Sequence, residues 1–504
     1  MKKFYITTSI AYTTANPHIG FALELIQADV LARYNRALGK DTFFLIGTDE
    51  HGFRVAEISK KLGKQPKEFA DEISAKFKEL SSLLNLSNDD FIRTTDEKRH
   101  LPAVEKVWKK LEQSGDIYKK KYRGLYCNRC ETFITKKDLV NGKCQIHKVR
   151  PDIVEEENHF FKLSKYLPKI KEKIEKNEIK IIPQTRKNEV LGFIKQGLED
   201  ISFSRPKQSL KWGFSVPGDP DFTIYVWADA LSNYISAIGY EKENKKFKKY
   251  WPADVHCIGK DILKFHALFW PAMLLSIELP LPKKIFVHGF ITVDGQKMSK
   301  SLGNVIDPFE LVEKYGTDAV RYFLLREISP TEDGDFTYEK FEQRYNSDLA
   351  SGIGNLLARV RVMADNINPK SQIPNSKQIP WTQRGLPVGL HPKFQTIIDE
   401  TRKKYKKALE EFKFNEALRA IWDLISFCDK YIEKERPWEN ENYELRIKNQ
   451  GVINDLLVVL DNIAELLEAF LPETSDRIIK EIARDKKTGE FVNKRGKLLF
   501  PKLN

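Results

Sequence analysis

The chain has 504 residues, enough for roughly two to four domains with cores of their own. A hydrophobic fraction of 41% is ordinary for a globular protein, and no stretch approaches the ~20 apolar residues that a membrane span requires. The net charge of +13 favours an acidic partner such as nucleic acid, although a lysine-rich proteome would give the same charge. Few cysteines, and a strand-like run directly after Met1 in place of a signal peptide, favour a reducing cytoplasm.

Strands and helices alternate in the N-terminal part. Residues 4–8 are β-rich, residues 22–37 have apolar side chains at helical spacing, and residues 43–47 form an uninterrupted apolar run. Such a run is typical of a parallel strand buried on both faces. Strand, helix and strand in succession predict the start of an α/β doubly wound parallel sheet.

The loop between the first strand and helix contains Pro17-His18-Ile19-Gly20 and neither glycine-rich phosphate signature. Pro17 and Gly20 favour a turn there. His18 would then lie among the free N–H groups of a helix N-terminus, which bind anions. A helix cap or a surface group would explain the same histidine.

Three titratable residues, Asp49, Glu50 and His51, follow the second strand between two glycines. Ligands of open α/β sheets bind beyond the carboxyl ends of the strands, so this stretch is a candidate site. A polar turn with a helix cap is the alternative.

Three cysteines and one histidine form two closely spaced pairs, Cys127 with Cys130 and Cys144 with His147. Three thiolates and an imidazole are the ligand set of a closed tetrahedral zinc site. Without an open coordination position, the metal would be structural and would hold together a small insertion that lacks a core. Reduced buried cysteines with a chance histidine are the alternative.

The second half of the sheet is predicted to begin at residues 224–227, and a further strand is predicted at 255–259. Aromatic or amphipathic residues lie at strand ends or in the turns after them, namely Tyr12, Trp227, Tyr234 and His266. They could belong to the core. They could also line an apolar slot with one polar tip, which suits a thioether side chain.

Residues 297–301 have the sequence Lys-Met-Ser-Lys-Ser and are flanked by glycines; we call this segment the lysine loop. Such a segment is predicted to be a mobile loop, whose ammonium groups can neutralise a polyphosphate as it breaks. A solvated basic loop is the alternative, because short motifs have a high false-positive risk.

After a mixed segment at 307–345 the chain is predicted to be helical. Apolar residues recur at helical spacing over 349–363, 417–432 and 456–471, and Pro472 is expected to stop the last of these helices. These stripes predict a helix bundle. Prolines mark a long irregular loop between the first two helices: Pro369, Pro374, Pro380, Pro387 and Pro392.

Together, Pro17–Gly20 and Lys297–Ser301 resemble the paired signatures of class I aminoacyl-tRNA synthetases, and the stretch Gly47–Gly52 narrows the resemblance to the methionyl-tRNA synthetase family. Residues 226–227, 258–261, 269–273 and the C-terminal helices extend it over essentially the whole chain. The resemblance implies a Rossmann-like doubly wound parallel sheet split by an insertion of the single-zinc-knuckle type, followed by an all-α bundle.

The resemblance also implies a division of the chain. The segments are the first catalytic half at 1–115, a connective insertion at 116–223, the second catalytic half with the lysine loop at 224–305, a stem-contact segment at 306–345 and an anticodon-binding bundle at 346–504.

The implied activity is ATP-dependent charging of tRNA(Met), including initiator tRNA, with L-methionine through a methionyl-adenylate. Mg²⁺ would arrive with ATP, and one Zn²⁺ would be structural. His18, Lys297 and Lys300 would act on the phosphates. A cytoplasmic monomer without membrane contact is expected, because the family's C-terminal extension does not follow Asn504.

The family's site residues map onto this sequence position by position. The methionine pocket would comprise Ile10, Tyr12, Asp49, Arg205, Trp227, Ala230, Leu231, Tyr234 and His266. ATP would contact His18, Gly20, Glu24, Gly259, Asp261, Lys297, Ser299 and Lys300. The anticodon would be read by Asn355, Arg359 and Trp438, through stacking and polar contacts. Asp49 would meet the amino group of the substrate, and Leu231 stands where other members have proline.

One position departs from the family pattern. Phe21 stands where a second histidine is usual, and a phenyl ring cannot donate a hydrogen bond to phosphate. We therefore expect a slower activation step. Two other interpretations stay open: a class I synthetase for another apolar amino acid, and a catalytically weakened tRNA-binding relative. The first lacks room for an editing insertion, and the intact lysine loop opposes the second.

Overall fold

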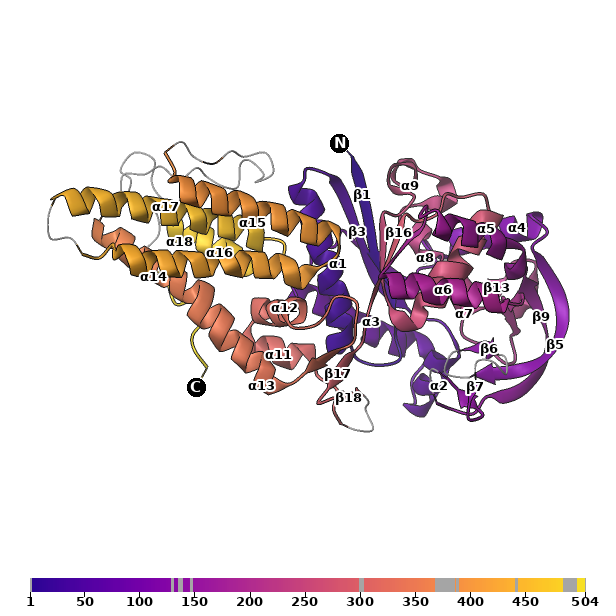
Figure 1. Cartoon of the computed structure of the whole chain (residues 1–504). Coiled ribbons are helices and arrows are strands. Elements are labelled where there is room, and N and C mark those ends of the chain that lie inside the picture. Colours follow the sequence, from indigo (N-terminus) through magenta and orange to yellow (C-terminus); the bar gives the residue numbers. More distant parts are fainter. Residues whose placement is uncertain are drawn as a thin grey trace.

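The structure is a computed structural model that describes residues 2–127, 131–134, 139–145, 148–298, 303–367, 386, 389–439, 443–483 and 496–503. The molecule is elongated (Figure 1). A parallel sheet lies in the middle, the C-terminal helices lie at one end, and the strands of the insertion lie at the other.

The central sheet is parallel in every pairing, with the strand order β10-β16-β15-β1-β3-β2 and with β4 also pairing to β3. Its strands are β1 (Lys3–Thr8), β2 (Ala11–Tyr12), β3 (Asp41–Asp49), β4 (Asp90–Arg93), β10 (Lys180–Ile182), β15 (Val255–Gly259) and β16 (Lys284–His288). The predicted α/β class is therefore confirmed. The order reverses between β1 and β15, and ligands of such sheets bind at the carboxyl ends beside that reversal.

Helix α1 (Ile19–Ala37) lies against β1 and β3 and is buried along most of its length. The sheet covers one side of it, and α12 (Thr317–Arg326) from the C-terminal part covers another. This double burial explains the apolar character of the helix and holds its N-terminus rigidly at the sheet edge. Further helices of this part of the chain are α2 (Phe53–Lys61), α3 (Pro66–Leu83), α4 (Leu101–Gln113), α8 (Asn233–Ser236), α9 (Lys245–Tyr250) and α10 (Trp270–Ser276).

The insertion forms an antiparallel sheet of its own, with the order β11-β9-β5-β6. Its two long strands form the curved ribbon at the edge of the molecule in Figure 1. Its elements are β5 (Ile117–Cys127), β6 (Thr132–Ile134), β7 (Leu139–Val140), β8 (Lys143–Cys144), β9 (Asp152–Phe161), α5 (Leu163–Glu175), α6 (Gln184–Gln196) and β11 (Ile201–Ser202). Strand β10 lies between α5 and α6 in sequence, yet joins the edge of the central sheet.

The strand predicted at 224–227 was wrong. Strand β14 (Asp219–Ile224) ends there, in a small antiparallel sheet with β12 (Ser204–Pro206) and β13 (Ser215–Val216), and the helix α7 (Val226–Ala230) follows. The Tyr225 carbonyl accepts hydrogen bonds from the amides of Ala228 and Asp229, so the chain turns into a helix. A short apolar run does not distinguish a strand from a buried turn.

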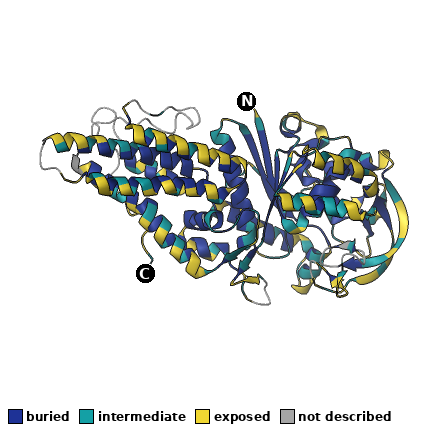
Figure 2. Cartoon of the chain, viewed as in Figure 1, coloured by how far each residue is buried: buried dark blue, intermediate teal, exposed yellow. Residues whose placement is uncertain are grey.

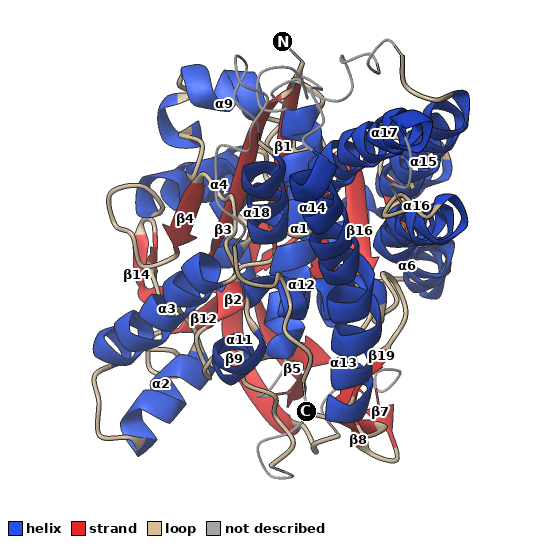
Figure 3. Cartoon of the chain, turned by 90° about the vertical axis from the view of Figure 1, so that its left-hand side faces the viewer, coloured by secondary structure: helices blue, strands red, loops and turns tan. Residues whose placement is uncertain are grey.

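The predicted helix bundle is confirmed. Before it come β17 (Ile291–Val293), β18 (Gln296–Lys297), α11 (Pro308–Tyr315), β19 (Gly334–Phe336) and α13 (Tyr338–Arg344). The bundle contains a π-helical stretch (Tyr345–Gly354), α14 (Asn355–Ile367), α15 (Pro392–Glu410), α16 (Phe414–Glu435), α17 (Tyr443–Leu467) and α18 (Pro472–Ile482). Buried residues line the inner faces of these helices (Figure 2), which stand in front of the sheet in Figure 3.

Two proline predictions in this part need correction. Helix α17 already ends at Leu467, and Pro472 begins α18; Pro392 likewise begins α15. Proline fits a first helical turn because the N–H it lacks would have no partner there. The other four loop prolines lie outside the described residues. In the ranges that the structure describes, no helix is long and apolar enough to cross a membrane.

Candidate active site

The first turn of α1 and the beginning of the lysine loop lie together. The Nδ1 atom of His18 accepts a hydrogen bond from the Gly20 amide at 3.1 Å and so caps the helix. The Ile19 amide donates to the carbonyl of Ile306, just beyond the loop, at 3.1 Å. A Cβ built on Gly20 would lie 3.7 Å from Met298 Cε and 2.9 Å from His18 Cε1, so a larger residue would not fit without a shift. The two signatures therefore meet at the carboxyl edge of the sheet.

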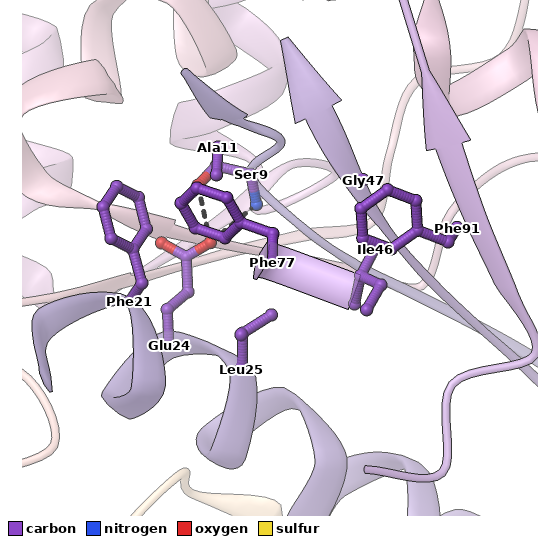
Figure 4. Close-up of a pocket in the computed structure, with 9 residues that line it drawn as sticks. All are labelled: Ser9, Ala11, Phe21, Glu24, Leu25, Ile46, Gly47, Phe77 and Phe91. Atoms are coloured by element: carbon purple, nitrogen blue, oxygen red, sulfur yellow. Dashed lines mark hydrogen bonds between the residues drawn. The ribbon is translucent and has the colours of Figure 1, made fainter. Parts of the chain in front are cut away.

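Glu24 lies one turn further along α1 and is almost fully buried. Its Oε1 accepts hydrogen bonds from the amide and hydroxyl of Ser9, at 2.8 and 2.6 Å (Figure 4). Its Oε2 lies 2.9 Å from His288 Nε2. This carboxylate thus links α1 to the ends of β1 and β16.

Asp261 follows β15, directly after Gly259 and Lys260. Burial raises the pKa of this carboxyl, while the positive charges of His288 and Lys297 oppose the rise. The lysine loop therefore faces the same acidic edge as Glu24. Ser299 and Lys300 lie outside the described residues.

Phe21 is half-buried between two rings. Its ring centre lies 4.6 Å from that of His18 and 5.1 Å from that of Phe77, which it meets edge-on. It also lines a small cavity beside α1 (Figure 4), with Ser9, Ala11, Glu24, Leu25, Ile46, Gly47, Phe77 and Phe91. The aromatic neighbour Phe77 explains how a phenyl group is accommodated at this position.

Three of the side chains predicted to line an apolar slot, Trp227, Tyr234 and His266, come together beside β15. The Tyr234 hydroxyl is 2.7 Å from His266 Nε2, and His266 Nδ1 is 3.1 Å from the carbonyl of Ile262. Burial lowers the pKa of His266 to about 4, so the ring is neutral near pH 7. Because Nδ1 must donate a hydrogen bond to that carbonyl, Nε2 accepts a hydrogen bond from the tyrosine hydroxyl. The indole of Trp227 stacks on Phe265, with ring centres 3.7 Å apart, and presents an edge to His266.

Asp49 and Tyr12, which are predicted to belong to the same slot, lie on neighbouring strands. They are paired in register between β2 and β3. The pKa of Asp49 is raised well above its usual range, first by burial and then by the charges of Asp229, Glu131 and Glu50. A substrate ammonium group would supply the missing positive charge.

Glu131 is a site residue that the sequence analysis missed. It belongs to the insertion, yet its carboxylate accepts hydrogen bonds from the Tyr12 hydroxyl at 2.5 Å and from the amides of Phe53 and Arg54 at 3.0 and 2.8 Å. It thus caps α2, whose own N-cap, Gly52, has no side chain to do so. The one available signal was its position directly after the cysteine pair.

The remaining pocket candidates are placed as follows. Ile10 lies beside Gly47, and Ala230 and Leu231 are buried at the end of α7. Arg205 lies on β12, with Nε 2.9 Å from Glu156 Oε2 and its guanidinium 4.0 Å above the ring of Tyr126. The contacts described for Arg205 are therefore to the insertion.

Family models match nearly the whole chain. The model described as tRNA synthetases class I (M) matches residues 4–138 and 130–361. The model described as anticodon-binding domain of tRNA ligase matches residues 394–496. The chain belongs to the class I (M) tRNA synthetase family.

Individual relatives agree with this assignment. The methionine–tRNA ligase of Caldanaerobacter subterraneus is 43% identical over 100% of this chain and 79% of its own length. That of Thermotoga maritima is 43% identical over 96% of this chain and 76% of its own length. Methionyl-tRNA synthetase of Mycobacterium tuberculosis in complex with methionyl-adenylate superimposes with a TM-score of 0.87, at 37% identity over 95% of this chain and 94% of that one.

The three anticodon candidates lie in the C-terminal part. Asn355 is exposed at the start of α14, and Trp438, just after α16, is 51% exposed. Arg359 is one turn after Asn355, with its NH1 3.4 Å from Asp429 Oδ1. Exposed amide and indole groups are available to unpaired bases.

The zinc candidates are described only in part. Cys127 and Cys144 are buried and form a small cluster with Ile134, and neither is in a disulfide. Cys130 and His147 lie outside the described residues. Among those that are described, no group of three His, Cys, Asp or Glu side chains is arranged to hold a metal.

Proposed function

We propose that this chain is a methionine–tRNA ligase, which forms methionyl-adenylate from L-methionine and ATP and then transfers the methionyl group to tRNA(Met). The observation that carries the proposal is the contact between the first turn of α1, at His18 and Gly20, and Met298 of the lysine loop. Full-length similarity to methionine–tRNA ligases supports the same conclusion.

In the first step, a carboxylate oxygen of methionine attacks the α-phosphorus of ATP, and the bond to the β-phosphate oxygen breaks to release pyrophosphate. No protein nucleophile is needed, so catalysis consists of positioning and charge stabilisation. His18 and Gly20 would hold the phosphates. The N–H groups predicted to be free are occupied in this structure, because the amides of Ile19 and Gly20 already donate hydrogen bonds to the Ile306 carbonyl and to His18 Nδ1. Lys297 and Lys300 would neutralise the leaving pyrophosphate, Ser299 would contact ATP, and Mg²⁺ would be carried by the nucleotide.

The nucleoside would lie along the ends of β15 and β16, against Gly259, Asp261 and Glu24. Methionine would occupy the slot whose tip is the Tyr234–His266 pair. The neutral imidazole supports this assignment, because a charged group there would disfavour a thioether. Asp49 would bind the ammonium group. The other pocket residues would be Ile10, Tyr12, Arg205, Trp227, Ala230 and Leu231.

The remaining segments take the roles implied by the family. We assign residues 1–115 and 224–305 to the catalytic domain, 116–223 to the insertion, 306–345 to stem contact and 346–504 to the anticodon-binding bundle. Asn355, Arg359 and Trp438 would read the anticodon of elongator and initiator tRNA(Met). The protein would act as a cytoplasmic monomer.

One structural Zn²⁺ would be held by Cys127, Cys130, Cys144 and His147. The two described thiols, buried without a disulfide in a small cluster, fit such a donor set. Bound metal would cross-link a segment that has little core of its own. Metal analysis of the purified protein should find about one zinc per chain, and Cys144→Ser should abolish it; a zinc-free protein with native thermal stability would contradict the assignment.

Amino-acid-dependent ATP–pyrophosphate exchange tests the proposed function. Methionine should support exchange, while leucine and the reaction without amino acid should not, and tRNA(Met) should then become charged. Exchange with leucine would favour a synthetase for another apolar amino acid. Absent exchange with tRNA binding retained would favour a weakened relative, for which Phe21 is the specific observation.

A further inference from the structure

A buried carboxylate behind the proposed methionine pocket binds two histidines. Asp229 is 1% exposed, and its Oδ2 lies 2.7 Å from His51 Nδ1 while its Oδ1 lies 2.8 Å from His100 Nε2. Both imidazoles are buried as well. His51 is 178 positions from Asp229 in sequence and His100 is 129, so the cluster exists only in the folded chain.

The cluster joins the elements that carry the pocket. Asp229 lies on α7, two positions after Trp227. His51 follows the end of β3, two positions after Asp49. His100 directly precedes α4, and its Nδ1 lies 2.8 Å from the hydroxyl of Ser236 on α8, the helix that carries Tyr234. One carboxylate therefore connects the ammonium side of the pocket with its aromatic wall and its polar tip.

Aromatic rings hold His51 in place. Its imidazole meets Trp212 and Phe214 edge-on, with ring centres 5.3 and 4.6 Å apart. The carbonyl of Trp212 accepts a hydrogen bond from the Gly52 amide, and the indole N–H of Trp212 donates a hydrogen bond to the carbonyl of Glu50. The backbone on both sides of His51 is thus bound to Trp212, and the imidazole of His51 connects this turn after Asp49 to Asp229.

Asp229 also contributes charge. Burial is the largest cause of the raised pKa of Asp49, and the negative charge of Asp229 is the next largest. A buried carboxylate is costly, and apolar residues of similar size would pack the same space at lower cost. Placing this carboxylate behind Asp49 instead provides a second negative charge toward the position of the substrate ammonium group.

We propose that Asp229 is a positioning residue for methionine, which acts through His51 on Asp49 and through His100 on the helix that carries Tyr234. The proposal rests on the methionine pocket proposed above. It assigns to Asp229 a selective effect on amino-acid binding, because none of its described partners belongs to the proposed ATP site.

Methionine binding by the full-length chain tests this inference. Asp229→Asn replaces one acceptor oxygen by an amide, which faces an imidazole N–H. The dissociation constant for methionine should rise roughly ten- to a hundredfold, while the KM for ATP should stay within about twofold. Asp116→Asn is the matched control: Asp116 is fully buried and accepts hydrogen bonds from Ser276 and Lys165, away from the pocket. It should lower the melting temperature and leave methionine affinity unchanged.

A second pair of variants keeps the test decisive if Asp229→Asn fails to fold. His51→Asn places an amide N–H where Nδ1–H was, and His51→Leu does not. The asparagine variant should retain methionine affinity within about threefold, and the leucine variant should lose roughly tenfold or more. Equal losses of methionine and ATP binding, or no loss in folded Asp229→Asn and His51→Leu, would overturn the inference.

Trp227→Ala separates this inference from the pocket assignment. If it weakens methionine binding while Asp229→Asn does not, only the inference is wrong. If Trp227→Ala leaves methionine binding intact, the pocket is assigned wrongly and the inference fails with it.

Discussion

At Asp49, burial and neighbouring carboxylates oppose ionisation. The pKa of Asp49 is raised well above its usual range, with burial as the largest cause. A bound ammonium group would reverse this imbalance, because it stabilises the ionised form. If Asp49 binds the substrate ammonium group as proposed, binding should release a proton from this carboxyl.

Methionine affinity should accordingly depend on pH. As the pH falls through the raised pKa of Asp49, the protonated carboxyl loses its attraction for ammonium, so the dissociation constant should rise. Between about pH 5 and 7 the substrate amine stays protonated and does not contribute. Calorimetric titrations across this range provide the measurement. Asp49→Asn should bind weakly with little pH dependence, and a wild-type affinity that is flat down to pH 5 would contradict the role.

Phe21 gives a second prediction at the residue scale. Phe21→His would restore a hydrogen-bond donor at the first turn of α1, although it loses part of the packing against Phe77. One donor to a developing phosphate charge is worth a hundredfold or more elsewhere, so we expect a gain of about tenfold in kcat for pyrophosphate exchange. Phe21→Leu, which adds no donor, is the control. An unchanged kcat in the histidine variant would show that the phenyl ring of Phe21 does not slow the activation step.

Among the elements, both α2 and β2 are joined to the insertion by the side chain of Glu131. Glu131 has a backbone φ of 50°, a conformation that costs free energy for a residue with a side chain, and it is nearly fully buried. The three hydrogen bonds that it accepts from Tyr12, Phe53 and Arg54 offset this cost. The insertion thereby orients one wall of the pocket.

Glu131→Gln should weaken the hydrogen bonds that position Tyr12 and the start of α2. The amide keeps only one acceptor atom, so at least one of the three donors loses its partner, at a cost of about 1–3 kcal/mol. We expect the KM for methionine to rise about tenfold in pyrophosphate exchange while the KM for ATP changes little. Glu157→Gln, an exposed position on β9, is the control. A wild-type KM for methionine would show that Tyr12 does not need this contact.

Across the whole molecule, α12 connects the catalytic sheet to the bundle. The fully buried guanidinium of Arg321 lies 2.8 Å from Asp29 Oδ2 on α1. It also donates to the carbonyls of Leu84, after α3, and of Ala469 and Phe470, after α17. Asp29 in turn accepts hydrogen bonds from the amide and the hydroxyl of Ser87. Segments far apart in sequence therefore share one buried ion pair.

Arg321→Met should destabilise the protein strongly. It leaves Asp29 buried with a reduced set of partners, at a cost of about 3–5 kcal/mol. Thermal unfolding should show a melting temperature lowered by several degrees, and limited proteolysis should cut faster between the sheet and the bundle. Adding Asp29→Asn should recover part of the loss, because it removes a buried charge whose remaining ionic partner is Arg33. Equal melting temperatures of wild type and Arg321→Met would refute this role.

Local patterns were enough to predict the elements that carry the two signatures. The apolar runs of β1 and β3 and the helical spacing of α1 predicted the parallel sheet correctly, since burial on both faces requires apolar residues at every position. Helix α1 begins at Ile19, earlier than the apolar pattern indicated, because the side chain of His18 caps it. The run at 224–227 failed as a strand because its backbone partners, rather than its side chains, decide between strand and turn.

The fold class, the two signature motifs and the candidate residues of the nucleotide edge could be predicted from the sequence, because each depends on neighbours within one element or on a recognisable pattern. Which distant side chains share a carboxylate became evident from the folded chain alone. Glu131 with Tyr12, Asp229 with His51 and His100, and Arg321 with Asp29 are pairs formed across more than a hundred positions. Their hydrogen bonds depend on the close approach of separate elements, which no local spacing in the chain encodes.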